Sequence, residues 1–262
     1  MTRAELPLTA QGAPMITLTD VHKAFGANKV LCGVTLKVAK GTSMVIIGGS
    51  GTGKSIMLKA ILGLLPPDSG TITVGGADIT QADRDAFLAR FGMLFQGAAL
   101  FDSLPVWQNV AFRLLRGRLK RPKAEAREIA ISKLRRVGLD ASVADRLPAE
   151  LSGGMQKRVG LARAIAADPE IIFFDEPTTG LDPIMAGVIN DLIREIVTEM
   201  GATAVTITHD MTSVRAIADQ VAMLHAGKIQ WTGPVTELDQ TTDPYVAQFI
   251  RGAATGPIET VR

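Results

Sequence analysis

The chain has 262 residues, 47% hydrophobic and 21% charged, which is ordinary for a folded globular protein and excludes a disordered tail protein, a collagen-like fibre and a disulfide scaffold. The net charge of +2 is too small to indicate a nucleic-acid partner. The single cysteine, Cys32, fits a reducing compartment. No apolar run approaches the roughly 18 residues that a membrane-spanning helix needs, so we expect a soluble, cytoplasmic chain that reaches a membrane only through a partner.

Residues 1–14 show no periodicity and are predicted to be a flexible tail. Beyond this tail, short apolar runs typical of strands alternate with stretches in which apolar residues recur at helical spacing. The predicted strands are 44–47, 171–174, 203–208 and 221–224, and the predicted helices are 54–65 and 183–200. The second helix has Asp182 as N-cap, Pro183 at its first position and Gly201 at its end. Apolar strands alternating with helices predict an α/β fold with a mostly parallel sheet covered on both faces.

The segment 97–164 contains no convincing strand and is predicted to be a helical subdomain inserted into the sheet domain. Its clearest signal is an apolar stripe at helical spacing, formed by Ala126, Ile129, Ala130, Leu134 and Val137. A basic run from Arg113 to Lys123 contains no acid. It indicates either a solvated surface or contact with anionic lipid headgroups.

The strongest local motif is a glycine-rich turn between a predicted strand and a predicted helix, which matches GxxxxGK[ST]. It consists of Gly48, Gly49, Ser50, Gly51, Thr52, Gly53, Lys54 and Ser55. Glycines allow the backbone to curl so that N–H groups face phosphate oxygens, and the following helix presents its positive end there. We expect Lys54 to neutralise β- and γ-phosphate charge and Ser55 to ligate Mg²⁺.

Two acids follow the apolar strand at 171–174. Asp175 is predicted to lie beside the phosphate loop and to hold Mg²⁺. Because side chains alternate along a strand, Glu176 is expected to point to the opposite side, where it could deprotonate an attacking water.

A third motif, Leu151–Gln156, opens a helical stretch. Ser152 is a natural N-cap, and Gly153 and Gly154 leave backbone N–H groups uncovered, so the motif could be a second anion site. By itself it is better explained as a plain helix cap.

From about residue 15 to about 233 the sequence resembles the ATP-binding subunits of ABC transporters. The motifs stand in that family's order: an adenine-stacking aromatic (Phe25), Walker A (Gly48–Ser55), the Q-loop glutamine (Gln96), the signature (Leu151–Gln156), Walker B (Asp175 and Glu176), the D-loop (Leu181 and Asp182) and the switch histidine (His209). A closer likeness, to the Mla-type (MCE-associated) phospholipid transport ATPases, lies in residues 47–51, 100–104, 155–162 and 180–184.

The resemblance implies a P-loop NTPase (RecA-like) core with a mostly parallel sheet, an N-terminal antiparallel β part and an inserted α-helical subdomain. The ATPase domain is expected at 15–240 and a C-terminal extension at 241–262. The extension has an apolar patch formed by Tyr245, Val246, Phe249 and Ile250, which could be a short amphipathic helix docked on this subunit or its neighbour.

The resemblance also implies the site. It implies catalytic roles for Glu176, as the general base, and for His209, Gln96 and Lys54. It implies that Mg²⁺ is ligated by Ser55, Gln96 and Asp175. Nucleotide contacts are expected from Phe25, Gly48, Gly49, Ser50, Gly51, Thr52, Gly53, Lys54, Ser55, Ile56, Ser152, Gly153, Gly154, Gln156 and Asp182. The signature would meet the ATP bound by a second copy, in a head-to-tail dimer.

The expected assembly therefore holds ATP, Mg²⁺, a second copy of the chain and permease subunits of the inner membrane, with an MCE-domain protein and no nucleic acid. One alternative keeps the ATPase but gives it an amino acid or another small solute as cargo. Another is a soluble ABC ATPase acting on DNA or ribosomes, against which the short segment 56–150 argues, because it leaves no room for long coiled coils. A regulatory module without turnover is disfavoured by Lys54, Asp175, Glu176 and His209.

Overall fold

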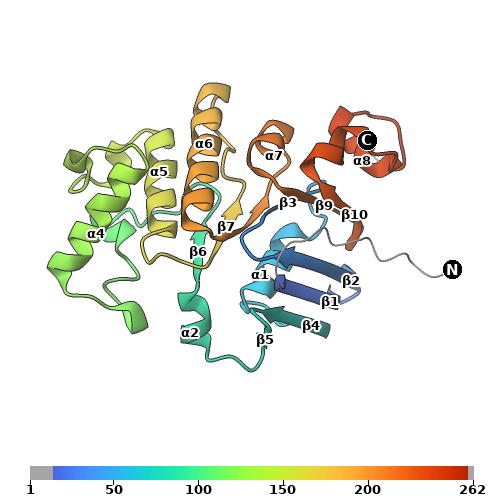
Figure 1. Cartoon of the computed structure of the whole chain (residues 1–262), viewed down its shortest axis with the longest axis horizontal. Coiled ribbons are helices and arrows are strands. Elements are labelled where there is room, and N and C mark those ends of the chain that lie inside the picture. The colour runs from blue at the N-terminus through green and yellow to red at the C-terminus, as the bar shows by residue number, and fades with distance from the viewer. Residues whose placement is uncertain (1–13, 259–262) are drawn as a thin grey trace.

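The computed structural model describes residues 14–258, and in that range the strands form two sheets (Figure 1). The smaller sheet is antiparallel, with the order β2-β1-β4-β5. Its strands are β1 (Pro14–Phe25), β2 (Asn28–Ala39), β4 (Ser69–Val74) and β5 (Ala77–Asp78). It is the predicted N-terminal antiparallel part. The predicted tail lies outside the described residues except for Pro14, with which β1 begins.

The larger sheet has the order β10-β9-β3-β8-β7-β6, and all neighbours are parallel except β9 and β10. Its strands are β3 (Ser43–Ile47), β6 (Phe91–Leu94), β7 (Ile171–Asp175), β8 (Thr203–Ile207), β9 (Gln220–His225) and β10 (Lys228–Pro234). The four strands predicted from apolar runs are confirmed as β3, β7, β8 and β9. Since parallel strands end at one edge of the sheet, the segments that follow β3, β6, β7 and β8 meet there.

Helices follow three of these strands: α1 (Lys54–Ile61) after β3, α6 (Pro183–Met200) after β7 and α7 (Met211–Ile217) after β8. The predicted bounds of α6 are confirmed, and Asp182 caps it by accepting from the N–H groups of Ile184 and Met185. The prediction for α1 was too long, because Gly63 has a left-handed backbone (φ 64°) that ends the helix early.

The helical part between β6 and β7 contains α3 (Val106–Val110), α4 (Lys123–Arg136) and α5 (Gly153–Ala164), with short 3₁₀ turns at Gly117–Leu119, Ala141–Val143 and Pro148–Glu150. None of residues 97–164 belongs to a strand, as predicted. The apolar stripe of α4 faces inward, with Ala126, Ala130 and Leu134 fully buried. The remaining elements are α2 (Arg84–Ala89), a 3₁₀ helix at Val235–Gln240 and α8 (Pro244–Arg251).

The larger sheet separates two hydrophobic cores, because its side chains alternate between its faces. In β3, Val45 and Ile47 pack with residues of α4, α5 and α6, whereas Met44 and Ile46 pack with α1 and the smaller sheet. Figure 1 shows α5, α6 and α7 above the larger sheet and α1 with the smaller sheet below it. Across residues 14–258, no helix is both long enough and apolar enough to span a bilayer.

The basic run from Arg113 to Lys123 is largely engaged within the fold. Arg113 points inward, where its guanidinium donates to the carbonyls of Leu88 and Phe91. Nη1 of Arg118 forms an ion pair with Oδ2 of Asp83 at 3.0 Å. Nε of Arg121 lies 3.9 Å from Oε1 of Glu125. These contacts favour the interpretation as a solvated protein surface over a surface for lipid headgroups.

Candidate active site

The loop between β3 and α1 winds tightly because Gly48, Gly51 and Gly53 have positive φ angles of 153°, 75° and 101°. A Cβ at Gly48 would lie 2.3 Å from the carbonyl oxygen of Leu224 in β9. A larger residue would therefore push the loop off the sheet. The first N–H groups of α1 have no carbonyl partner within the helix, so the loop and helix end form the predicted anion cradle.

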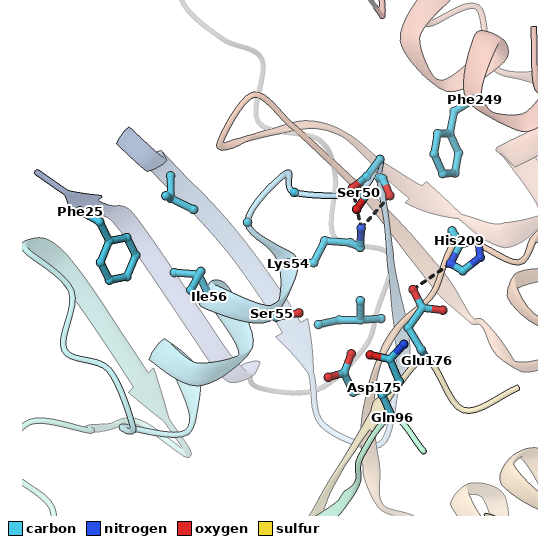
Figure 2. Close-up of a pocket in the computed structure, with 16 residues that line it drawn as sticks. Phe25, Ser50, Lys54, Ser55, Ile56, Gln96, Asp175, Glu176, His209 and Phe249 are labelled. Carbon is cyan, nitrogen blue, oxygen red and sulfur yellow. Dashed lines mark hydrogen bonds and ion pairs between the residues drawn. The ribbon is translucent and has the colours of Figure 1, made fainter. Parts of the chain in front are cut away.

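Lys54 begins α1 and is almost completely buried. Its ammonium donates to the carbonyls of Gly48 at 2.7 Å and Gly49 at 2.8 Å, so it lies across the loop (Figure 2). Burial lowers the pKa of Lys54, while the charges of Glu176 and Asp175 oppose that shift. These two acids therefore help to keep a cation beside the phosphate loop.

Asp175 is the last residue of β7, and Glu176 follows it. Burial is the main cause that raises the pKa of Asp175, and the charge of Glu176 raises it further. The expectation that the two carboxylates point to opposite sides was wrong, since both line one cavity. The reason is that Glu176 lies beyond the strand in a left-handed conformation (φ 48°), where the alternation of a strand no longer applies.

The Glu176 carboxylate has three side-chain partners. Its Oε1 lies 2.9 Å from Nδ1 of His209 (Figure 2), and its Oε2 accepts from the hydroxyls of Thr179 at 3.0 Å and Thr208 at 3.5 Å. A carboxylate has about four lone-pair positions, so these bonds orient the group and leave capacity for a water. His209 is held at the end of β8, where Asp210 caps α7.

A cavity of about 690 Å³ brings most of the predicted site residues together (Figure 2). The predicted residues that line it are Phe25, Gly48, Gly49, Ser50, Gly51, Gly53, Lys54, Ser55, Ile56, Gln96, Asp175, Glu176 and His209. Thr52 belongs to the phosphate loop but does not line the cavity. Its hydroxyl donates to the backbone carbonyl of Gly49 within the loop. Phe25 is about half exposed at one end of the cavity.

The signature residues do not line this cavity. Ser152 is the N-cap of α5, where its hydroxyl oxygen accepts from the N–H of Met155, and Gly153 and Gly154 form the first turn. The side chain of Gln156 donates to the carbonyls of Pro148 and Leu151. Asp182 is the cap of α6 described above. Within one chain, these five predicted nucleotide contacts therefore lie outside the cavity of the phosphate loop, and Gln156 and Asp182 have structural partners of their own.

Three lining residues were not predicted from the sequence: Val30 from β2, Ile207 from β8 and Phe249 from α8. Val30 and Ile207 are apolar strand residues that no motif singles out. Phe249 was noticed as part of the apolar patch of the C-terminal extension. No signal in the sequence relates that patch to the phosphate loop, because the cavity they share is lined by distant parts of the chain.

The donor atoms around Asp175 fit Mg²⁺. Ser55, Gln96 and Asp175 supply a hydroxyl, an amide and a carboxylate to the same cavity, and Mg²⁺ typically binds one or two carboxylates together with substrate phosphates. In residues 14–258 no cluster of three or more histidine, cysteine or acidic side chains could hold a metal on its own. The site is thus suited to a metal that arrives with phosphates.

Comparison with known proteins agrees with this geometry. The family model described as ABC transporter matches residues 31–179. TRIGALACTOSYLDIACYLGLYCEROL 3 of Arabidopsis thaliana is 41% identical, with 93% of this chain and 75% of that protein covered. The probable ribonucleotide transport ATP-binding protein mkl of Mycobacterium tuberculosis is 39% identical, with 95% and 71% covered. The intermembrane phospholipid transport system ATP-binding protein MlaF of Haemophilus influenzae is 41% identical, with 86% of each chain covered.

The fold also matches solved structures. One is described as the dimeric post-hydrolysis state of the ATP-binding cassette MJ0796 bound to ADP and Pi. It is 31% identical, with a TM-score of 0.76 and with 84% of this chain and 99% of that chain covered.

Proposed function

This chain belongs to the ABC transporter family, and from that premise we propose that it hydrolyses ATP to power a transporter that moves phospholipid between membranes. The observation that carries the ATPase part is the single cavity that holds Lys54, Gln96, Asp175, Glu176 and His209. The lipid part rests on the names of the relatives MlaF and TRIGALACTOSYLDIACYLGLYCEROL 3. Because mkl is named for ribonucleotide transport, the cargo needs its own experiment.

The phosphate loop would bind and orient the nucleotide. Its backbone N–H groups and the Lys54 ammonium would exchange their present partners for phosphate oxygens, and Phe25 would stack on the base at the open end. When bound, Mg²⁺ would be held by Ser55, Gln96 and Asp175 and would neutralise charge on the β- and γ-phosphates.

Glu176 is the proposed general base. Its carboxylate would accept a proton from the attacking water as the water's oxygen adds to the γ-phosphorus and the bond to the β-phosphate oxygen breaks. The contacts from His209 and Thr179 fix the carboxylate in the cavity, so that little rearrangement is needed for the reaction. His209, which is mostly exposed, would also reach the γ-phosphate.

The second half of each site would come from another copy. The position of Ser152, Gly153 and Gly154 outside the cavity supports this, as does the dimeric state named for the MJ0796 cassette. In that head-to-tail arrangement the start of α5 in one subunit would face the γ-phosphate bound by the other. We further propose that the dimer attaches to permease subunits on the cytoplasmic face of the inner membrane, with an MCE-domain protein in the complex.

The catalytic assignment is tested with Glu176→Gln. The variant keeps the size of the side chain and removes the base, so we expect ATP affinity within about twofold of wild type and turnover lower by about 100-fold or more. Affinity is measured by titration with ATP and Mg²⁺, and turnover by phosphate release. Turnover near the wild-type rate would show that Glu176 is not the base.

The cargo is tested by purifying the tagged chain from native membranes in mild detergent and identifying its proteins and lipids by mass spectrometry. We expect a multi-span permease, an MCE-domain protein and phospholipid. A permease without phospholipid would favour an importer of amino acids or another small solute. Ribosomal or DNA-associated proteins without a permease would contradict the transport proposal altogether.

A further inference from the structure

One buried cation near the cavity has no part in the mechanism above. Lys157 lies in α5 and is only 4% exposed. Its ammonium donates to the backbone carbonyl oxygen of Glu176 at 3.2 Å. It is not among the residues that line the cavity, so it reaches the site through the backbone of Glu176.

The peptide that Lys157 contacts is in an unfavourable conformation. Glu176 has a φ of 48°, in the left-handed region that a residue with a side chain adopts only when its surroundings enforce it. Its N–H donates to the carbonyl of Ile207 in β8 at 2.9 Å. Its carbonyl accepts from Lys157 at 3.2 Å and also from the N–H of Thr179 at 3.3 Å. Both polar groups of the Glu176 backbone are therefore held, the N–H by the sheet and the carbonyl by α5 together with the turn that follows β7.

The charges around Lys157 match this position. Burial lowers the pKa of Lys157, and the charges of Glu176 and Asp175 oppose the shift and favour the ammonium. The same ammonium in turn lowers the pKa of Asp175 against the effect of its burial. Lys157 is therefore a shielded cation that is bonded to the Glu176 carbonyl and whose charge is favoured by the two acidic residues at the end of β7.

We propose that Lys157 is a positioning residue for ATP hydrolysis. Its ammonium holds the Glu176 peptide in the left-handed conformation that aims the carboxylate at the attacking water. In doing so it ties α5, whose N-cap is Ser152, to the backbone of Glu176 in the same chain. The inference rests on the proposed role of Glu176 as general base.

The first test compares Lys157→Met with Lys133→Met. Lys133 is a matched control, since it is also shielded (13% exposed) and lies in the helical part, but it pairs with Asp168 instead of the site. We expect Lys157→Met to lower kcat by about 10- to 100-fold, the cost of a small misplacement of a catalytic group, with the Kd for ATP within about twofold. Lys133→Met should leave both kcat and the Kd for ATP at their wild-type values. Lys157→Arg, which keeps the donor and the charge, should recover a large part of kcat.

The second test separates positioning from general damage to the fold. In a Glu176→Gln background, where the base is gone, Lys157→Met should not slow the residual turnover further, because residues that act as a unit are not additive. Equal slowing in both backgrounds, or a loss of ATP affinity as large as the loss of kcat, would overturn the inference.

The possible failures are distinguishable. If Glu176→Gln hydrolyses ATP near the wild-type rate, the assignment of the base fails, whatever Lys157 does. If Glu176→Gln is inactive and Lys157→Met is not slowed, only the positioning role fails. Should Lys157→Met not fold, Lys157→Leu takes its place in the same two backgrounds, because it also removes both the donor and the charge.

Discussion

At the carboxyl end of β7, Asp175 keeps a carboxylate in surroundings that raise its pKa, first by burial and then by the charge of Glu176. A raised pKa in the folded state means that the ionised carboxylate is less stable there than in the unfolded chain. Function needs the ionised form, because only the carboxylate would ligate Mg²⁺. Stability and activity therefore make opposite demands on this residue.

Asp175→Asn should raise the Tm of the nucleotide-free protein at about pH 8 and abolish Mg²⁺-dependent ATP binding. The sign follows from the raised pKa of Asp175: above it, the ionised group lowers the free energy of unfolding. Near the ordinary pKa of about 4, the folded state holds more of the group protonated than the unfolded chain does, so this cost is smaller. The gain in Tm should therefore shrink as the pH falls toward about 4. Thermal melts over this range check it, with Asp102→Asn at an exposed position as control. A variant less stable than wild type at pH 8 would contradict the argument.

Single residues also show what the sequence can and cannot predict. The placement of Lys54 on the phosphate loop was predictable, because a glycine-rich turn before a helix allows few conformations. The direction of Glu176 was not, because the strand ends one residue earlier than the alternation argument assumed. The residue types around Glu176 do not predict the left-handed backbone that brings both carboxylates into one cavity.

Among the elements, α8 is the one whose position matters most for the site. Val246 is fully buried in the larger core, and the rings of Tyr245 and His225 lie 4.9 Å apart, so the helix docks against the end of β9. This docking places Phe249 at the wall of the cavity near His209 (Figure 2). The apolar spacing of the extension predicts a helix, but the docking depends on long-range contacts that a local pattern does not contain.

Phe249→Ala should weaken ATP binding by about 3- to 10-fold, because a partly buried aromatic wall contributes on the order of 1 kcal/mol. Ile250→Ala is the control, since Ile250 is the next residue of α8, is also partly buried and does not line the cavity. Both variants should lose similar amounts of thermal stability, and only the first should change the Kd for ATP. Equal Kd values for the two variants would show that α8 is only a structural support.

For the molecule as a whole, the site in one chain is incomplete if the signature acts in a second copy. The order of motifs along the sequence made the overall architecture predictable, from the parallel sheet to the inserted helices. The register of the antiparallel sheet was not predictable from local pattern, because it depends on how distant segments pack. The separation of the signature from the cavity was expected only through the family resemblance.

A mixture of two inactive variants tests the shared site. Lys54→Ala should disable the phosphate loop, and Gly153→Asp should place a negative charge where the γ-phosphate of the other subunit is expected; a Cβ at Gly153 meets nothing within 4 Å, so the fold tolerates it. Each variant alone should be nearly inactive. Mixed, half of the dimers would combine the two chains with one intact site each, so about a quarter of the wild-type turnover should return. A mixture as inactive as its parts would contradict signature action in trans.

The two cores on either side of the larger sheet have a consequence for how such a chain can diversify. Met44 and Ile46 share a core with α1, which supports the phosphate loop, while Val45 and Ile47 share one with the inserted helices. A change of packing volume among those helices acts first on the face of the sheet that carries Val45 and Ile47, whereas α1 packs on the opposite face. Descendants of one ancestor can therefore remodel the helical half toward new partners without direct change to the packing that supports α1 and the phosphate loop.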